Sequence, residues 1–316
     1  TPDITVRNII GVGATLSGVL TYEDVTNIDS IGIITARSHV SIADSILHTG
    51  DTNTAIRFPA ADTFTVETAG SERLRVDSSG RLLLGTSTSP TAGQGLNARL
   101  VIQGYAPSTP QGGGYMSLQR GQAATAFGAN NQLGLINFGD NTGASFAGIE
   151  CYSDAASAAN DFPGRLVFST TADGASTTTE RLRITSAGAA IFKSGLAEKY
   201  ENAGTTLGAQ PNNPLSGGNV ILFTGNESGN KTINFTGVHA TLSNGETVSF
   251  TAIITPNNSG VINVVQVDGQ AITVKWSGGS VPTAGASGQD IYTFQILKTG
   301  TGVSNYTVFG AATNYS

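Results

Sequence analysis

Several carboxylates lie close together in the middle of this sequence, and paired carboxylates can cleave glycosidic bonds. Glu150, Asp154 and Asp161 form the closest group, and Asp140 and Asp173 flank it. Two acidic side chains on either side of a sugar bond are the usual machinery of glycoside hydrolases. The same residue types also cap backbone groups in turns, and the chain is only 7% aromatic, with no aromatic-rich stretch here to hold a sugar chain. We therefore expect turn residues and no enzymatic activity, with a polysaccharide-degrading enzyme as the alternative.

Metal, nucleophile and phosphate chemistry have weaker support. His39, His48 and His239 are isolated in the sequence, whereas zinc sites commonly use closely spaced ligands. Cys151 has no basic neighbour in sequence that would favour its thiolate. The glycines at 112–114 do not follow a strand and open a helix, as phosphate-binding loops do. We expect no catalytic residue, no metal and no cofactor.

A repeated motif organises the elements of the chain. The stretch 71–84, Ser-Glu-Arg-Leu-Arg-Val-Asp-Ser-Ser-Gly-Arg-Leu-Leu-Leu, returns in looser form at 179–192. Apolar residues alternate in both copies, which predicts a hairpin with one apolar face, and Gly80 or Gly188 falls at its turn. Any two amphipathic hairpins look somewhat alike, but the identical Glu-Arg-Leu-Arg core favours true repetition. Such repetition is typical of stacked or elongated proteins.

The opposite face of each hairpin copy carries arginines beside a glutamate. The arginines are Arg73 and Arg75 in the first copy and Arg181 and Arg183 in the second, and Glu72 or Glu180 lies beside them in the sequence. In an oligomer they could form inter-chain ion pairs that set the register of neighbouring chains. Exposed pairs contribute only about 0–1 kcal/mol each, so this hypothesis concerns register rather than stability. A solvated strand face is the alternative.

Composition limits how much core a single chain can form. Gly makes up 41 of the 316 residues and charged residues only 12%, with a single Trp and a single Met. Few large apolar side chains therefore offset a conformational entropy of about 1–2 kcal/mol per residue, so we expect an obligate oligomer and favour a trimer. The net charge of −6 without a basic run argues against nucleic acid as a partner, and no apolar stretch predicts membrane insertion. Because the chain starts at Thr1 without Met, we expect a fragment or a processed product.

Turn residues divide the chain into β-rich segments without a convincing helical period. We expect a shaft segment at 1–95, a central module at 96–195, a linker at 196–218 and a β-sandwich at 219–316, with one hairpin copy ending each of the first two. The sandwich is predicted from alternating apolar residues and the Asp268-Gly269 turn, with Trp276 as its core aromatic. The predicted fold class is all-β: an elongated trimeric fibre with repeated hairpins and a C-terminal β-sandwich.

The first hairpin copy, continued by Leu84-Gly85-Thr86-Ser87-Thr88-Ser89-Pro90, resembles a repeat in tail fibres and other virion proteins of tailed phages. Residues 18–37 and 58–67 are similar to segments in fibres of marine cyanobacterial phages, and parts of 276–310 are similar to C-terminal modules of the same group. The resemblance covers most of the chain and is loosest in the last part. It implies a trimeric fibre on the virion that touches the cell surface, and it identifies no individual receptor contact.

These patterns predict a structural fibre protein that attaches a virion to its host. The structural alternative is a capsid-decorating or baseplate-associated spike, and the enzymatic alternative is a polysaccharide-degrading tailspike. Expected partners are further copies of the chain, other tail or baseplate proteins, and a host cell-surface glycan or protein. Binding residues commonly lie on loops. We therefore place receptor contacts in the last module, at Asn257, Asn258, Gly269, Gly278 and Gly279.

Overall fold

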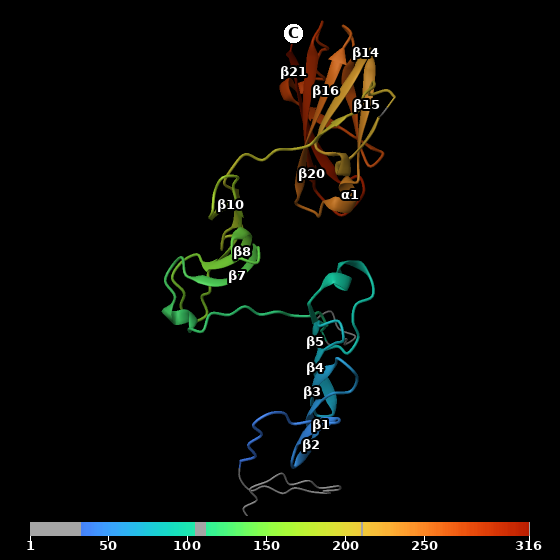
Figure 1. The fold of residues 1–316 in the computed structure, drawn as a ribbon. Helices are drawn as coiled ribbons and strands as arrows, with labels where there is room; N and C mark the ends of the chain where they lie inside the picture. Colours follow the sequence, from blue (N-terminus) through green and yellow to red (C-terminus); the bar gives the residue numbers. More distant parts are fainter. Residues whose placement is uncertain (1–32, 105–111, 210, 316) are drawn as a thin grey trace, which may run out of the picture. The chain divides into compact units, whose positions relative to one another are not determined.

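The computed structural model describes residues 33–104, 112–209 and 211–315, which form four β-sheets (Figure 1). The chain divides into a first unit, Thr1–Leu118, and a second unit, Gln119–Ser316. Helical segments are short: α1 at Val238–Thr241 and the 3-10 turns η1 at Gly93–Asn97, η2 at Ala124–Ala126, η3 at Leu215–Gly217 and η4 at Ser277–Gly279. The all-β fold class is confirmed. Residues 18–32 of one phage-like segment lie outside the described residues.

The first sheet has six strands in the order of the chain. They are β1 Ser45–His48, β2 Asp51–Arg57, β3 Phe64–Thr68, β4 Ser71–Val76, β5 Leu82–Leu84 and β6 Leu100–Ile102. β1 to β5 form an antiparallel meander, and β6 runs parallel to β5. The register aligns one apolar residue from every strand in a row across the sheet: Ile46, Ile56, Val66, Leu74, Leu84 and Ile102.

The second sheet is also an antiparallel meander, with the order β11-β10-β9-β8-β7. Its strands are β7 Gln132–Gly139, β8 Ser145–Ser153, β9 Gly164–Thr171, β10 Thr178–Ile184 and β11 Ala190–Phe192. An equivalent apolar row crosses it: Ile136, Ile149, Phe168, Leu182 and Phe192. The row is again complete, with one apolar side chain from each strand.

The structure confirms the hairpin repeat and extends it. Leu74 faces Leu84 in the first copy as Leu182 faces Phe192 in the second, so the two hairpins share one register. Each copy also holds one extra residue opposite the preceding strand, Arg73 in β4 and Arg181 in β10, which is a β-bulge. Because β1 to β3 precede the first hairpin as β7 to β9 precede the second, the repeated unit is a five-stranded meander.

In both meanders the apolar face is the less buried one. No member of either apolar row is fully buried, and Ile46 and Phe192 are 49% and 52% exposed. The buried residues described in the first unit lie instead on the opposite face, namely Ala55, Thr65, Asp77 and Leu83. In the second sheet Arg165, Val167 and Ser169 are buried on the opposite face. A sheet with one solvated face normally packs its apolar side against its own core, and the described chain provides no such cover here.

The last part of the chain forms the predicted β-sandwich, from sheets ordered β12-β14-β16-β20-β21-β19 and β13-β15-β17-β18. The strands are β12 Tyr200–Asn202, β13 Asn212–Pro214, β14 Val220–Glu227, β15 Asn230–Thr236, β16 Thr247–Pro256, β17 Val261–Val267, β18 Gln270–Ile272, β19 Val274–Trp276, β20 Gln289–Lys298 and β21 Tyr306–Tyr315. One buried cluster takes side chains from both sheets. Phe235 of β15 stacks on Phe250 of β16 with ring centroids 4.2 Å apart, which joins the two sheets.

Trp276 closes the edge of this core and does not form its centre. It is half-buried, and its ring lies edge-on to Tyr292 and Phe294, at 6.3 and 5.9 Å between centroids. Phe235 and Phe250, at no more than 1% exposure, are the central aromatic residues. The expectation for Trp276 is therefore only partly right, because its parity points inward but its strand is an edge strand.

Two stretches of the expected linker, residues 200–202 and 212–214, are strands of the sandwich. β12 pairs in parallel with β14, and β13 with β15. Leu207 is fully buried, and its backbone N–H donates to the buried carboxylate of Glu227, which lies 3.2 Å from Lys231 Nζ. The linker predicted over residues 196–218 is therefore wrong where β12 and β13 form. The boundary expected at 95 also shifts, because β6 belongs to the first sheet.

Candidate binding surfaces

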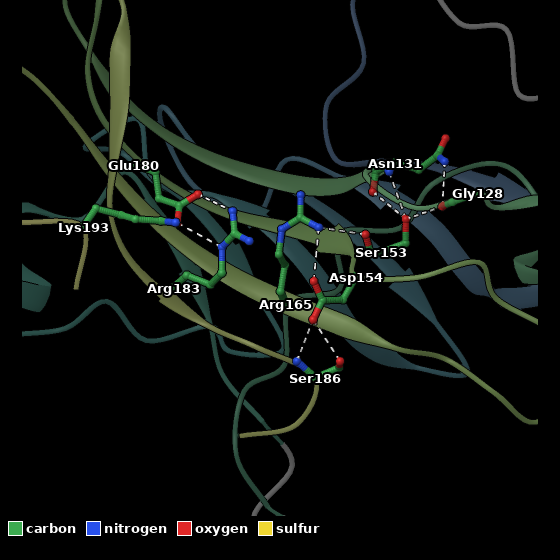
Figure 2. Close-up of polar contacts among 9 residues, drawn as sticks. All are labelled: Gly128, Asn131, Ser153, Asp154, Arg165, Glu180, Arg183, Ser186 and Lys193. Atoms are coloured by element: carbon green, nitrogen blue, oxygen red, sulfur yellow. Dashed lines mark hydrogen bonds and ion pairs between the residues drawn. The ribbon is translucent and has the colours of Figure 1, made fainter. Parts of the chain in front are cut away.

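A network of charged side chains covers the polar face of the second sheet (Figure 2). Arg183 donates two hydrogen bonds to Glu180, from Nε to Oε1 at 2.9 Å and from Nη2 to Oε2 at 2.6 Å. Lys193 Nζ lies 3.5 Å from the same carboxylate. These contacts, the Arg183 hydrogen bond first, lower the pKa of Glu180 below its ordinary value. The Glu180 carboxylate therefore stays ionised, and it joins Arg183, on the other side of the bulge in β10, to Lys193.

The first sheet repeats this arrangement. Arg75 binds Glu72 in the same two-pronged way, at 2.7 and 2.6 Å. The bulge arginines also match, since Arg73 donates to Thr68 Oγ1 at 3.0 Å as Arg181 donates to Thr170 Oγ1 at 2.9 Å. Because of the bulge residue, a glutamate and an arginine that are three positions apart in the sequence lie on the same face: Glu72 with Arg75, and Glu180 with Arg183. All of these contacts lie within one chain, and a role for the arginines between chains stays a prediction.

Two of the central carboxylates, Asp154 and Asp140, form local structural contacts. Asp154 Oδ2 accepts hydrogen bonds from the backbone N and the Oγ of Ser186 at 3.0 and 2.9 Å, and its Oδ1 lies 3.4 Å from Arg165 Nη1 (Figure 2). These contacts, the Ser186 backbone first, lower the pKa of Asp154, whereas a general acid needs a raised pKa. Asp140 accepts from the N–H groups of Thr142 and Ala144 in its own turn. Such caps are what these residue types commonly form in turns.

Glu150 lies in a polar hollow of about 360 Å³ on the same sheet, which Glu180 also lines. Its carboxylate accepts hydrogen bonds from Tyr152 Oη, from Ser169 Oγ at 2.9 Å and from Gln132 Nε2 at 3.2 Å. Arg165 lies 5.0 Å above the Tyr152 ring. Glu150 and Glu180, the two acids of this hollow, thus both have hydrogen-bond partners within the sheet.

The turn of the first hairpin depends on Asp77, which is 8% exposed. Its Oδ1 accepts from the backbone N–H groups of Ser79 and Arg81 at 2.9 and 3.0 Å, and its Oδ2 accepts from Arg81 Nε at 2.8 Å and from Ser89 Oγ. These hydrogen bonds, with that of Ser89 the strongest, lower the pKa of Asp77 far below its ordinary value. Thr185 takes this position in the second copy, where its Oγ1 accepts only from Ala189 N, at 3.1 Å.

We expect Asp77→Asn to lower the melting temperature at pH 7 and to flatten its decline in acid. The pKa of Asp77 is lower in the folded chain than in the unfolded one. The stabilisation is therefore fully present above the unfolded value of about 3.9 and is lost as the pH falls through the folded value. Circular dichroism melts between pH 7 and pH 2 measure this. Asp62→Asn, at an exposed turn of the same sheet, is the control, and parallel pH profiles for wild type and Asp77→Asn would contradict the prediction.

The loops predicted to contact a receptor do not form one surface. Asn257 and Asn258 precede β17, and Gly269 follows it, so the seven-residue strand separates them by roughly 20 Å. Gly278 and Gly279 lie in η4, directly after β19. All five residues are exposed. Contact of any of them with a receptor stays a prediction.

The outer face of the larger sandwich sheet carries a groove of about 580 Å³. Its lining includes a row of small side chains in register across three strands, Thr251, Thr293 and Ala311. The next row is larger and crosses four strands: Ser249, Gln295, Phe309 and Lys275. Phe309 is 45% exposed, and Lys275 Nζ lies 5.5 Å from the centre of its ring. The groove thus combines an aromatic ring, hydroxyl groups, an amide and a cation.

Comparisons with known proteins add little to this geometry. No family model and no curated protein matches the chain. The carboxy-terminal domain of the bacteriophage T5 L-shaped tail fibre is similar at 12% identity and a TM-score of 0.21, over 52% of this chain and 90% of that one. The same domain with its intramolecular chaperone domain gives 14% identity and a TM-score of 0.21, over 45% of this chain and 50% of that one. At these TM-scores neither likeness bears on the fold or the function of this chain.

In the part of the chain that the structure describes, none of the helices has the length and apolar character needed to cross a membrane. The same residues bring together no group of three or more potential metal ligands.

Proposed function

We propose that this chain is a structural fibre protein of a tailed-phage virion, that it assembles as a homotrimer, and that it attaches the particle to a host cell. The observation that carries the proposal is the uncovered apolar row that crosses each of the two meanders. Burying a large apolar side chain contributes about 1.5–3 kcal/mol. A row of such residues on an open face therefore favours association with a second apolar surface.

Identical copies of the chain supply that surface at the same position in the sequence. Three sheets that turn their apolar faces toward a common axis enclose a core to which each chain contributes one side. The repeated meander would provide two such cores in succession along one chain. Unfolding then requires chain separation, which gives the kinetic resistance that an extracellular fibre needs.

The phage assignment and the number of chains rest on the resemblance of residues 71–90 to virion proteins. In this role the chain lies on the particle surface and contacts other tail or baseplate proteins and a host cell-surface glycan or protein. It does not bind nucleic acid or insert into a membrane. The role is adhesive rather than catalytic, which agrees with the local hydrogen bonds that occupy Asp140, Glu150 and Asp154.

Sedimentation equilibrium of the full chain tests the assembly, and we expect three times the chain mass of 32.2 kDa. A folded monomer would refute the proposal. Electron microscopy of the parent particle with this chain gold-labelled tests the location. Label along the tail fibres is expected, whereas label over the capsid or the baseplate would favour a decorating or spike protein.

A further inference from the structure

We infer that the groove over β16, β20, β21 and β19 binds an acidic saccharide unit of the host surface, an inference that rests on the proposed attachment function. Binding pockets for small molecules combine apolar or aromatic surface with a few well-placed polar groups. A saccharide ring has the matching chemistry, with C–H groups on its faces and hydroxyl groups around its rim. The groove offers one partner for each part of such a ring.

Phe309 supplies the apolar partner. It is 45% exposed near the middle of β21, on a face where its neighbours in register are Gln295 and Lys275. The small residues Thr293 and Ala311 beside it leave room above the sheet. A single exposed ring in a polar setting suits one sugar ring rather than an extended apolar contact.

The groove also offers hydrogen-bonding groups for the hydroxyl groups of a sugar: two threonine hydroxyl groups and one amide that is held in place. The hydroxyl groups of Thr251 and Thr293 have no hydrogen-bond partner within the described chain. The amide of Gln295 is held on both sides, since its Oε1 accepts from Ser249 Oγ at 2.6 Å and its Nε2 donates to Thr247 Oγ1. Fixing a polar side chain before binding reduces the entropy lost on binding.

The charge of the groove selects an acidic ligand. Lys275 is the one charged residue in its lining, and the described chain gives it no ion pair. The chain as a whole has a net charge of −6, so this cation is distinctive. A carboxylate on the sugar would form a charge-assisted hydrogen bond with Lys275, which is stronger than a neutral one.

Two other occupants fit less well. A peptide strand would add along the free edge of β19, whereas the groove lies on the face of the sheet, where β16, β20 and β21 are hydrogen-bonded to one another. A second copy of the chain would favour an apolar face like those of the meanders, whereas Phe309 is the one large apolar side chain standing outward in this lining. The saccharide therefore agrees best with both the shape and the chemistry of the groove.

Saturation-transfer NMR on the full chain tests this inference with three probes: the methyl glycosides of glucuronic, galacturonic and N-acetylneuraminic acid. We expect at least one to bind, and methyl glucoside to bind more weakly. Phe309→Ala should abolish saturation transfer, and Lys275→Gln should weaken the acidic probe about tenfold while leaving methyl glucoside unchanged. Tyr315→Ala removes another exposed ring of the same strand, 55% exposed and outside the groove lining, and should change nothing.

The inference fails if none of the three acidic probes binds, or if binding survives Phe309→Ala. It also fails if Phe309→Ala changes the mass of the assembly, because the groove would then be an interface between copies. These results are separable from failure of the proposed function. A trimer located on tail fibres that binds no acidic sugar removes only this inference, whereas a monomer that binds one removes the fibre proposal and leaves the site.

Discussion

Phe192→Glu is expected to break the assembly into smaller species, whereas Ile191→Glu is expected to leave it intact. The two residues are neighbours in β11 and are both exposed in the single chain, at 52% and 39%. Phe192 belongs to the apolar row opposite Leu182, and Ile191 lies on the other face opposite Arg183. If the chain acted alone, both changes would be surface substitutions within about 0.5 kcal/mol of neutral. In the trimer, Phe192→Glu would bury an unpaired carboxylate from each chain, and burying such a charge costs several kcal/mol.

A second matched pair in the same sheet gives an independent check. Ile136 and Leu135 are neighbours in β7, 37% and 43% exposed, and they face Ile149 and Glu150 respectively. Ile136→Glu should reduce the sedimenting mass, and Leu135→Glu should not. Sedimentation velocity at one protein concentration compares all four variants. Equal behaviour within either pair would mean that the apolar face is not the contact between copies.

The sequence could predict the repeated hairpin because strand alternation is a local property. Leu74, Leu84 and Leu182 fall on one parity, and that parity specifies a face wherever the strand is regular. The bulges at Arg73 and Arg181 shift the alternation by one position. No local signal marks them, because a bulge is defined by the strand opposite. The contacts of Arg75 with Glu72 therefore emerge only in the paired sheet.

The full length of the repeat could not be predicted for a related reason. Between β1 to β3 and β7 to β9 the similarity hardly extends beyond the row itself, where Ile56 corresponds to Ile149 but Val66 corresponds to Phe168. The linker prediction failed at β12, Tyr200–Asn202, and at β13, Asn212–Pro214, because Gly, Pro and Asn are typical of connectors. These residues instead pair in parallel with β14 and β15, and parallel pairing joins distant segments.

The residues that line the groove could not be predicted together from the sequence, because distant segments supply them. Phe309 and Lys275 are far apart in the sequence, and only the parallel pairing of β19 with β21 makes them neighbours. Alternation along β21 could place Phe309 on the outer face. It could not show which residues lie beside it. Contact of the predicted loops with a receptor stays a prediction, whereas the groove that we infer to bind a saccharide lies on a sheet face.

The other large effect that we expect is the loss of stability of the sandwich in Phe235→Ala. Phe235 is fully buried, stacks on Phe250 at 4.2 Å and packs against Phe294 at 5.4 Å. Truncating a buried Phe to Ala costs about 3–5 kcal/mol, because apolar contacts are lost and a cavity remains. Domains have a total stability of about 5–15 kcal/mol. The variant module should therefore unfold at a much lower urea concentration than the wild type.

Trp276 makes this measurement specific to the module. It is the single Trp of the chain, and it packs on the same core, edge-on to Tyr292 and Phe294. Its fluorescence during urea unfolding thus reports the sandwich without interference from the meanders. Tyr315→Ala, at a 55% exposed ring of the same module, should shift the midpoint little. If Phe235→Ala unfolds at the same urea concentration as Tyr315→Ala, the aromatic stack is not what joins the two sheets.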